Sequence, residues 1–141
     1  MTLYAETSAV LRWLFAERDG DVLLQRLRSA DKVVCSRLTL IEARRVIRRA
    51  ARERRISEAE AGGLRSQLAL AAARWAVLEL TRDVAARAEE AFPSEPIRTL
   101  DALHLASALL LRQSLPDLAV LSTDSRVRTN ASQLGLVVLP E

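Results

Sequence analysis

Four carboxylic acids stand beside predicted strands or helix starts, where parallel α/β folds carry their chemistry. Glu6 directly follows the first predicted strand and Asp124 follows the fourth. Glu42 lies near the start of the helix after the second strand, and Asp101 lies in the first turn of the helix before the fourth strand. Sites in such folds lie beyond the carboxyl ends of the strands. We therefore expect these four side chains to lie near one end of a sheet.

Asp101 is the carboxylate that most needs a partner. Its predicted helix around Leu100–Leu111 is apolar almost all round, interrupted only by His104 and Ser107, which is typical of a buried helix. A carboxylate at the N-terminal end of such a helix requires a counter-charge. Arg98 is the only arginine close in sequence, and a bound divalent cation is another counter-charge. The ordinary alternative for each acid is a cap or surface charge, since acids are stabilised in the first turn of a helix.

Oxygen ligands without cysteine or several histidines suit a hard cation such as Mg²⁺ or Mn²⁺. Such an ion polarises a phosphate, generates hydroxide from water and stabilises the leaving oxygen. An ion of this kind promotes phosphodiester hydrolysis. Convergence of four carboxylates also predicts mutual repulsion that destabilises the metal-free fold. The metal-ligating and catalytic residues we predict are Glu6, Glu42, Asp101 and Asp124.

Short apolar segments alternate with helical patterns along the chain, without internal repeats. The predicted strands are Leu3–Ala5, Val33–Cys35, Trp75–Leu80, Leu118–Leu121 and Leu136–Leu139. The longest predicted helices run from about Leu38 to Arg54, from a capping box at Ser57 and Glu60, and from a Thr99 cap to about Gln113. This alternation predicts an α/β fold with a central parallel sheet of about five strands, flanked by helices on both faces.

Length and composition limit the class of protein further. A chain of 141 residues, half of them hydrophobic, predicts one domain with a core of its own. No apolar run approaches the ~18 residues of a membrane span, and no basic segment precedes an apolar stretch at Met1, so we expect neither membrane association nor secretion. The single Cys35 fits a reducing compartment, which predicts a cytoplasmic protein.

Several short motifs occur in a characteristic order. They are Glu6–Ser8, Ser36–Ala43, Leu100–Ala106 (LDALHLA), Thr123–Asp124 and Ala131–Gly135. In this order they resemble the PIN-domain ribonuclease family of the VapC toxin type, over essentially the whole chain. The resemblance implies one PIN domain over residues 1–141, and an Mg²⁺-dependent endoribonuclease toxin for which Mn²⁺ can substitute. It also implies an RNA substrate, a homodimer and neutralisation by a cognate antitoxin protein.

Glu6 departs from the pattern, because the family more often has aspartate there. Glutamate places its carboxylate one carbon–carbon bond further out, about 1.5 Å, and magnesium tolerates misplaced ligands poorly. A degenerate PIN domain that binds RNA or a protein partner without cleavage is therefore the alternative. A phosphoacceptor signalling domain also gathers acids at strand ends, but it pairs acids after the first strand and has a late lysine. The only lysine here, Lys32, comes too early.

Other side chains have both functional and structural interpretations. The hydroxyls of Thr7 and Ser8 are accessory groups that orient ligands or a phosphate, or else helix caps. His104 has the spacing of a general base one turn after Asp101, but a structural histidine is the better interpretation.

Arginines crowd the long helix that follows the second predicted strand. Arg44, Arg48 and Arg52 share one stripe of this helix, which predicts contact with RNA phosphates or with an acidic antitoxin segment. A solvated outer face is the third interpretation. No aromatic residue interleaves the run, which makes base stacking there a poor hypothesis.

Overall fold

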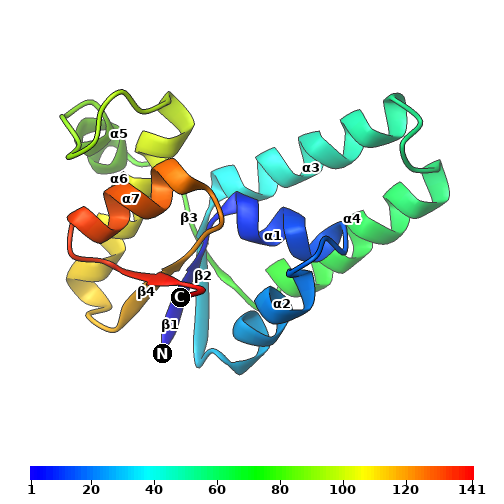
Figure 1. The fold of residues 1–141 in the computed structure, drawn as a ribbon, viewed down its shortest axis with the longest axis horizontal. Coiled ribbons are helices and arrows are strands. Elements are labelled where there is room, and N and C mark those ends of the chain that lie inside the picture. The colour runs from blue at the N-terminus through cyan, green and yellow to red at the C-terminus, as the bar shows by residue number, and fades with distance from the viewer.

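Five short parallel strands form one sheet in the computed structural model, which describes residues 1–141 (Figure 1). Their order in the sheet is β3-β2-β1-β4-β5. The strands are β1 (Thr2–Ala5), β2 (Lys32–Ser36), β3 (Ala76–Leu78), β4 (Leu118–Leu121) and β5 (Val137–Leu139). The predicted α/β class and the five-stranded parallel sheet are confirmed.

Seven helices cover the two faces of this sheet, with α1 to α4 on one side and α5 to α7 on the other (Figure 1). They are α1 (Thr7–Leu14), α2 (Gly20–Ser29), α3 (Arg37–Arg52), α4 (Glu58–Ala72), α5 (Arg82–Ala88), α6 (Thr99–Ser114) and α7 (Ser125–Gln133). Helix α6 begins at Thr99 as expected, but its N-cap is Arg98 rather than Thr99, and no side chain caps it.

Alternate strand residues face two separate cores, as a sheet covered on both sides requires. In β1, Leu3 and Ala5 join the core formed with α1 to α4, whereas Tyr4 joins the core formed with α6 and α7. In β4, Ala119 and Leu121 follow the first pattern, while the alternating residues Leu118 and Val120 follow the second. Both faces of the central strands are therefore buried.

Helices α3 and α4 form an antiparallel pair that extends away from the sheet (Figure 1). The predicted capping box is present, since the side chains of Ser57 and Glu60 each accept from the other's backbone N–H. Gly62 and Gly63 do not interrupt α4. None of the helices is long and apolar enough to cross a membrane.

The register brings the carboxyl ends of the central strands to one edge. Ala5 of β1 lies opposite Leu121 of β4, and the backbone N–H of Glu6 donates to Leu121 O at 3.0 Å. On the other side of β1, strand β2 ends at Ser36, from which α3 begins. The residues that leave β1, β2 and β4 therefore start from the same edge of the sheet.

Candidate functional site

Glu6 is the N-cap of α1, and its carboxylate is held inside a polar cluster with Ser8 and Ser122. Its Oε2 accepts hydrogen bonds from Ser8 N at 3.1 Å, from Ser122 Oγ at 2.7 Å and from the Ser8 hydroxyl. The Ser8 hydroxyl also accepts from the backbone N–H groups of Thr123 and Asp124, at 2.9 and 3.2 Å. Glu6 is only 5% exposed. Its side chain therefore caps α1, while the Ser8 hydroxyl holds the loop after β4.

Glu42 ends a chain of buried hydrogen bonds that starts in the centre of the sheet. The Tyr4 hydroxyl lies 2.7 Å from His104 Nδ1, and His104 Nε2 lies 2.6 Å from Glu42 Oε1. Thr7 Oγ1 donates to the same Oε1 at 2.7 Å. A carboxylate can only accept, so Nε2 must carry the proton that it donates. His104, 1% exposed, thus orients Glu42, which is the structural interpretation of this histidine.

The surroundings of Glu42 favour its charged form. Burial raises the pKa of this carboxyl, but the hydrogen bonds from His104 and Thr7 and the charge of Arg98 outweigh burial, so the pKa lies below its usual 4.5. Burial also raises the pKa of Tyr4 well above its ordinary value, so that hydroxyl stays protonated. Glu42 is therefore expected to be ionised at neutral pH.

This depressed pKa predicts how stability depends on pH. A carboxyl whose folded pKa lies below its unfolded value stabilises the fold above the unfolded pKa, and this contribution is lost as the pH falls through the folded pKa. We expect the free energy of unfolding of Glu42→Gln to fall less steeply below about pH 4.5 than that of the wild type. Denaturant titrations at several pH values measure the slopes. Glu90→Gln, at an exposed glutamate, is the control and should follow the wild type.

Asp101 and Asp124 meet through one guanidinium, that of Arg98. Arg98 Nε donates to Asp101 Oδ2 at 3.0 Å, and its Nη2 donates to Asp124 Oδ2 at 3.2 Å. Hydrogen bonds to Asp101 and the charges of Asp101, Asp124 and Glu42 raise the pKa of Arg98. The other oxygen of Asp124, Oδ1, accepts from the N–H groups of Arg126 and Val127 and caps α7.

The structure therefore brings the four predicted acids to one edge of the sheet in three separate settings. Glu6 lies with the two serines, Glu42 with His104, and Asp101 and Asp124 with Arg98. No set of three histidine, cysteine, aspartate or glutamate side chains is arranged to hold a metal ion. The predicted repulsion is also corrected, because Arg98 lies between two of the carboxylates and its charge acts on a third.

The donor set nevertheless suits a hard cation. Magnesium commonly binds through one or two carboxylates and keeps several waters. Asp101 and Asp124 already share one positive charge, and the carboxylate of Glu42 lies within that charge's influence. The chemistry of these residues thus fits Mg²⁺ or Mn²⁺, although a cationic side chain stands in their midst.

Two residues that contact these acids or their supports, Tyr4 and Ser122, were not identified from the sequence, and neither was the bridge that Arg98 forms between Asp101 and Asp124. Ser122 directly precedes Thr123 and Asp124, so its position was a usable signal. Tyr4 is one residue in a buried strand, and no local pattern links it to His104 one hundred residues later.

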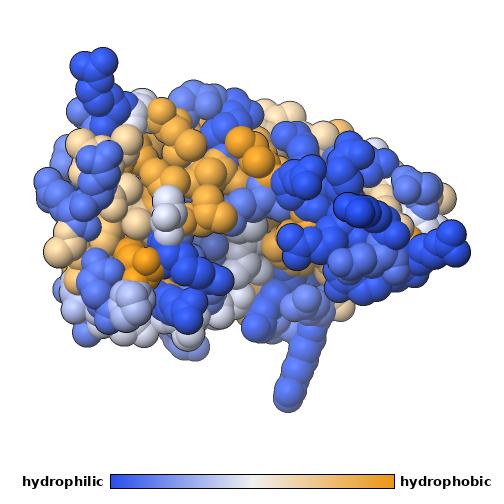
Figure 2. Space-filling model, turned by 90° about the horizontal axis from the view of Figure 1, so that it is seen from above, coloured by the Kyte–Doolittle hydropathy of each residue, from blue (hydrophilic) through white to orange (hydrophobic).

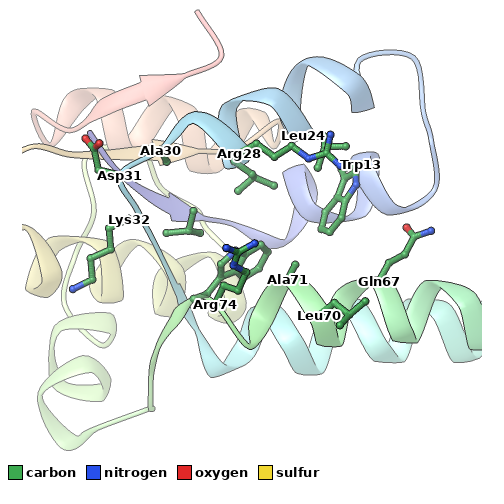
Figure 3. Close-up of a pocket in the computed structure, with 13 residues that line it drawn as sticks. Trp13, Leu24, Arg28, Ala30, Asp31, Lys32, Gln67, Leu70, Ala71 and Arg74 are labelled. Atoms are coloured by element: carbon green, nitrogen blue, oxygen red, sulfur yellow. The ribbon is translucent and has the colours of Figure 1, made fainter.

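One cavity lies at the other edge of the sheet, near the start of β2. It encloses about 830 Å³ between α2 and α4. Figure 3 shows Trp13, Leu24, Leu70 and Ala71 along it, with Lys32 at one end. None of the four predicted acids lines this cavity. The acidic edge and this cavity are therefore separate features.

The predicted arginine stripe lies on the outer side of α3. Arg44, Arg48 and Arg52 are all exposed, whereas Ala43, Ile47 and Ala50 of the same helix are buried. None of the three arginines forms an ion pair. Figure 2 shows hydrophilic surface gathered over the end of the molecule where the α3–α4 pair projects. The three arginine side chains are therefore exposed to solvent.

Comparison with known proteins covers nearly the whole chain. The family model described as PIN domain matches residues 3–133. The protein called ribonuclease VapC35 of Mycobacterium tuberculosis is 30% identical over 141 residues, which span 97% of this chain and 95% of that protein. Ribonuclease VapC49 of the same species is also 30% identical, across 98% of this chain and 94% of its own length.

Solved structures share the fold at lower identity. A toxin–antitoxin complex from Klebsiella pneumoniae contains a chain with a TM-score of 0.65 and 19% identity, matched over 100% of this chain and 98% of that one. Mycobacterium tuberculosis VapC20, described as a sarcin-ricin loop cleaving toxin, has a TM-score of 0.66 and 16% identity, with 96% of each chain covered. The chain therefore belongs to the PIN-domain family and, within it, to the VapC ribonucleases of toxin–antitoxin systems.

Proposed function

We propose that this protein is a metal-dependent endoribonuclease toxin that hydrolyses RNA phosphodiester bonds. The observation that carries the proposal is the meeting of Asp101 and Asp124 at the edge of the sheet where Glu6 and Glu42 also lie. The relatives named ribonucleases match this chain over nearly its full length, which supports RNA as the substrate.

The four acids divide the work in this proposal. Asp101, Asp124 and Glu42 are the residues that would hold Mg²⁺ or Mn²⁺, with Glu6 as a fourth ligand or as the support that fixes the loop after β4. When bound, the ion would polarise a phosphate and lower the pKa of a water molecule. Thr7 and His104 keep Glu42 ionised and oriented, and the Ser8 hydroxyl positions the backbone at Asp124.

The degenerate domain remains the second proposal because of Glu6. Three donors already occupy its Oε2, and the side chain caps α1. A carboxylate satisfied in this way needs no metal. Purified protein, incubated with RNA in EDTA and then with Mg²⁺ or Mn²⁺, distinguishes the two. We expect cleavage only with metal, whereas binding without cleavage under every condition would favour the degenerate domain.

We also propose a cognate antitoxin and a homodimer as the assembly, acting in the cytoplasm where RNA is available. Support for the antitoxin comes from the fold shared with a chain of the Klebsiella pneumoniae toxin–antitoxin complex. Support for the dimer comes from Ile41 and Leu100, large apolar side chains that are 47% and 45% exposed and directly precede Glu42 and Asp101. Sedimentation analysis of the purified chain measures the oligomeric state.

The exposed stripe on α3 predicts a contribution to RNA binding. Replacing Arg44, Arg48 and Arg52 with glutamine should weaken binding, because fewer counterions are released from the RNA. The slope of log affinity against log salt should become shallower by about 2 for three lost contacts with single-stranded RNA. Fluorescence anisotropy at several salt concentrations measures this slope.

A charge-matched variant controls for the change in net charge. Arg18, Arg65 and Arg82 are exposed, lie outside α3 and form no ion pair. Their replacement removes the same total charge and should alter the slope much less. Equal slopes for the wild type and the α3 variant would mean that the stripe is a solvated face or serves a protein partner.

A further inference from the structure

Arg98 is an unusual neighbour for a cation site. Its guanidinium contacts Asp101 and Asp124 at 3.0 and 3.2 Å, and no other arginine or lysine pairs with any of the four acids. The side chain of Asp101 is only 8% exposed, so its charge depends on this partner. The negative charge of Asp101 and Asp124 is thus partly balanced by a side chain of the same protein.

The Arg98 side chain is also free to leave. It is 63% exposed, and its only side-chain hydrogen bonds are those to Asp101 and Asp124. Although Arg98 is the N-cap residue of α6, its side chain does not cap the helix. Withdrawal of the guanidinium into solvent would therefore break two ion pairs and disturb no packed core.

We propose that Arg98 is an internal counter-cation that competes with the divalent ion for Asp101 and Asp124. Metal binding then requires the guanidinium to leave, and Arg98 sets the metal concentration at which the site fills. The inference rests on the proposed function, since it takes these acids to be metal ligands. It adds that Asp101 and Asp124 are paired with Arg98, and that metal binding exchanges these ion pairs for bonds to the metal.

Isothermal titration of Mn²⁺ into the metal-free protein tests the competition. Arg98→Gln is expected to bind Mn²⁺ about tenfold more tightly than the wild type, because the metal no longer has to break two partly exposed ion pairs, each of modest net strength. Arg98→Lys keeps the charge but lacks the fork that reaches both carboxylates, so its affinity should lie between the two. Arg65→Gln, at an exposed arginine on α4, loses the same charge at a distance and should match the wild type.

The results separate this inference from the function on which it rests. Equal or weaker Mn²⁺ binding by folded Arg98→Gln, with normal binding by the wild type, overturns the competition and leaves the metal site standing. Absence of Mn²⁺ binding by both proteins overturns the metal site and the competition together. Circular dichroism establishes that each variant is folded.

A second readout uses the wild-type protein. The Nε–H signal of Arg98 in ¹⁵N-labelled protein is assigned by its absence from Arg98→Gln. Hydrogen bonding to Asp101 should slow its exchange with water in EDTA, and saturating Mg²⁺ should speed that exchange several-fold. An exchange rate that Mg²⁺ saturation leaves unchanged would show that Arg98 stays in place, contrary to the proposal.

Discussion

Asp101→Asn is expected to cleave RNA at least tenfold more slowly than the wild type, which corresponds to about 1.4 kcal/mol or more of lost transition-state stabilisation. Asparagine keeps the shape of the side chain but removes its charge. Asp101 is one of the two acids joined through Arg98 and the more deeply buried of the pair. Loss of this charge weakens cation binding and also frees Arg98 from one partner.

The measurement is the rate of RNA cleavage at fixed Mn²⁺, with circular dichroism to verify folding. Asp83→Asn is the matched control, because Asp83 also lies in the first turn of a helix but is exposed. It should cleave at the wild-type rate. A folded Asp101→Asn protein with full activity would remove Asp101 from the proposed site.

Much of the fold was predictable because burial on both faces leaves a clear pattern. The apolar runs of β1, β2 and β4 each coincide with a predicted strand, and their order with the helices implies a parallel sheet. The edge strands β3 and β5 are shorter than predicted, three residues each. Local hydrophobicity does not show how many residues of an edge strand pair with the neighbouring strand. The ends of β3 and β5 were therefore predicted less well.

Placement of the acids was predictable from topology, whereas their partners were not. A parallel sheet sends the residues after each strand to one edge, which is enough to gather Glu6 and Asp124. The rotamer of Arg98 decides whether Asp101 and Asp124 repel each other or share a cation, and rotamers depend on the folded surroundings. The sequence therefore led to an expectation of repulsion, where the structure has an ion-paired bridge.

The hydrogen-bonded support of Glu42 shows the same limit. His104 was predicted to be structural, and this histidine is indeed enclosed. That it joins Tyr4 to Glu42 follows only from the packing of α6 against β1 and α3. Contacts between residues so distant in sequence have no local signature in a single chain.

Metal is expected to stabilise the wild-type protein against heat. Binding to the native state alone contributes RT ln(1 + [L]/Kd), about 2.7 kcal/mol at a hundredfold excess over Kd. For a chain of this length that corresponds to roughly 8 °C in Tm. Differential scanning fluorimetry in EDTA, followed by a titration with Mn²⁺, measures the shift. If the four acids are only helix caps or surface charges, Mn²⁺ should leave the Tm unchanged.

Asp124→Asn separates the metal site from the helix cap at the same residue. Asparagine is as good an N-cap as aspartate, so α7 should remain capped. Loss of the ion pair with the exposed Arg98 should cost at most about 1 kcal/mol in EDTA, because surface pairs are weak. With Mn²⁺ the Tm of the variant should rise much less than that of the wild type, since a ligand is missing.

Asp21→Asn, in the first turn of α2, is the control, and its Tm should rise with Mn²⁺ as much as that of the wild type. A wild-type Tm that stays constant throughout the Mn²⁺ titration would argue strongly that these acids are caps and ion-pair partners only.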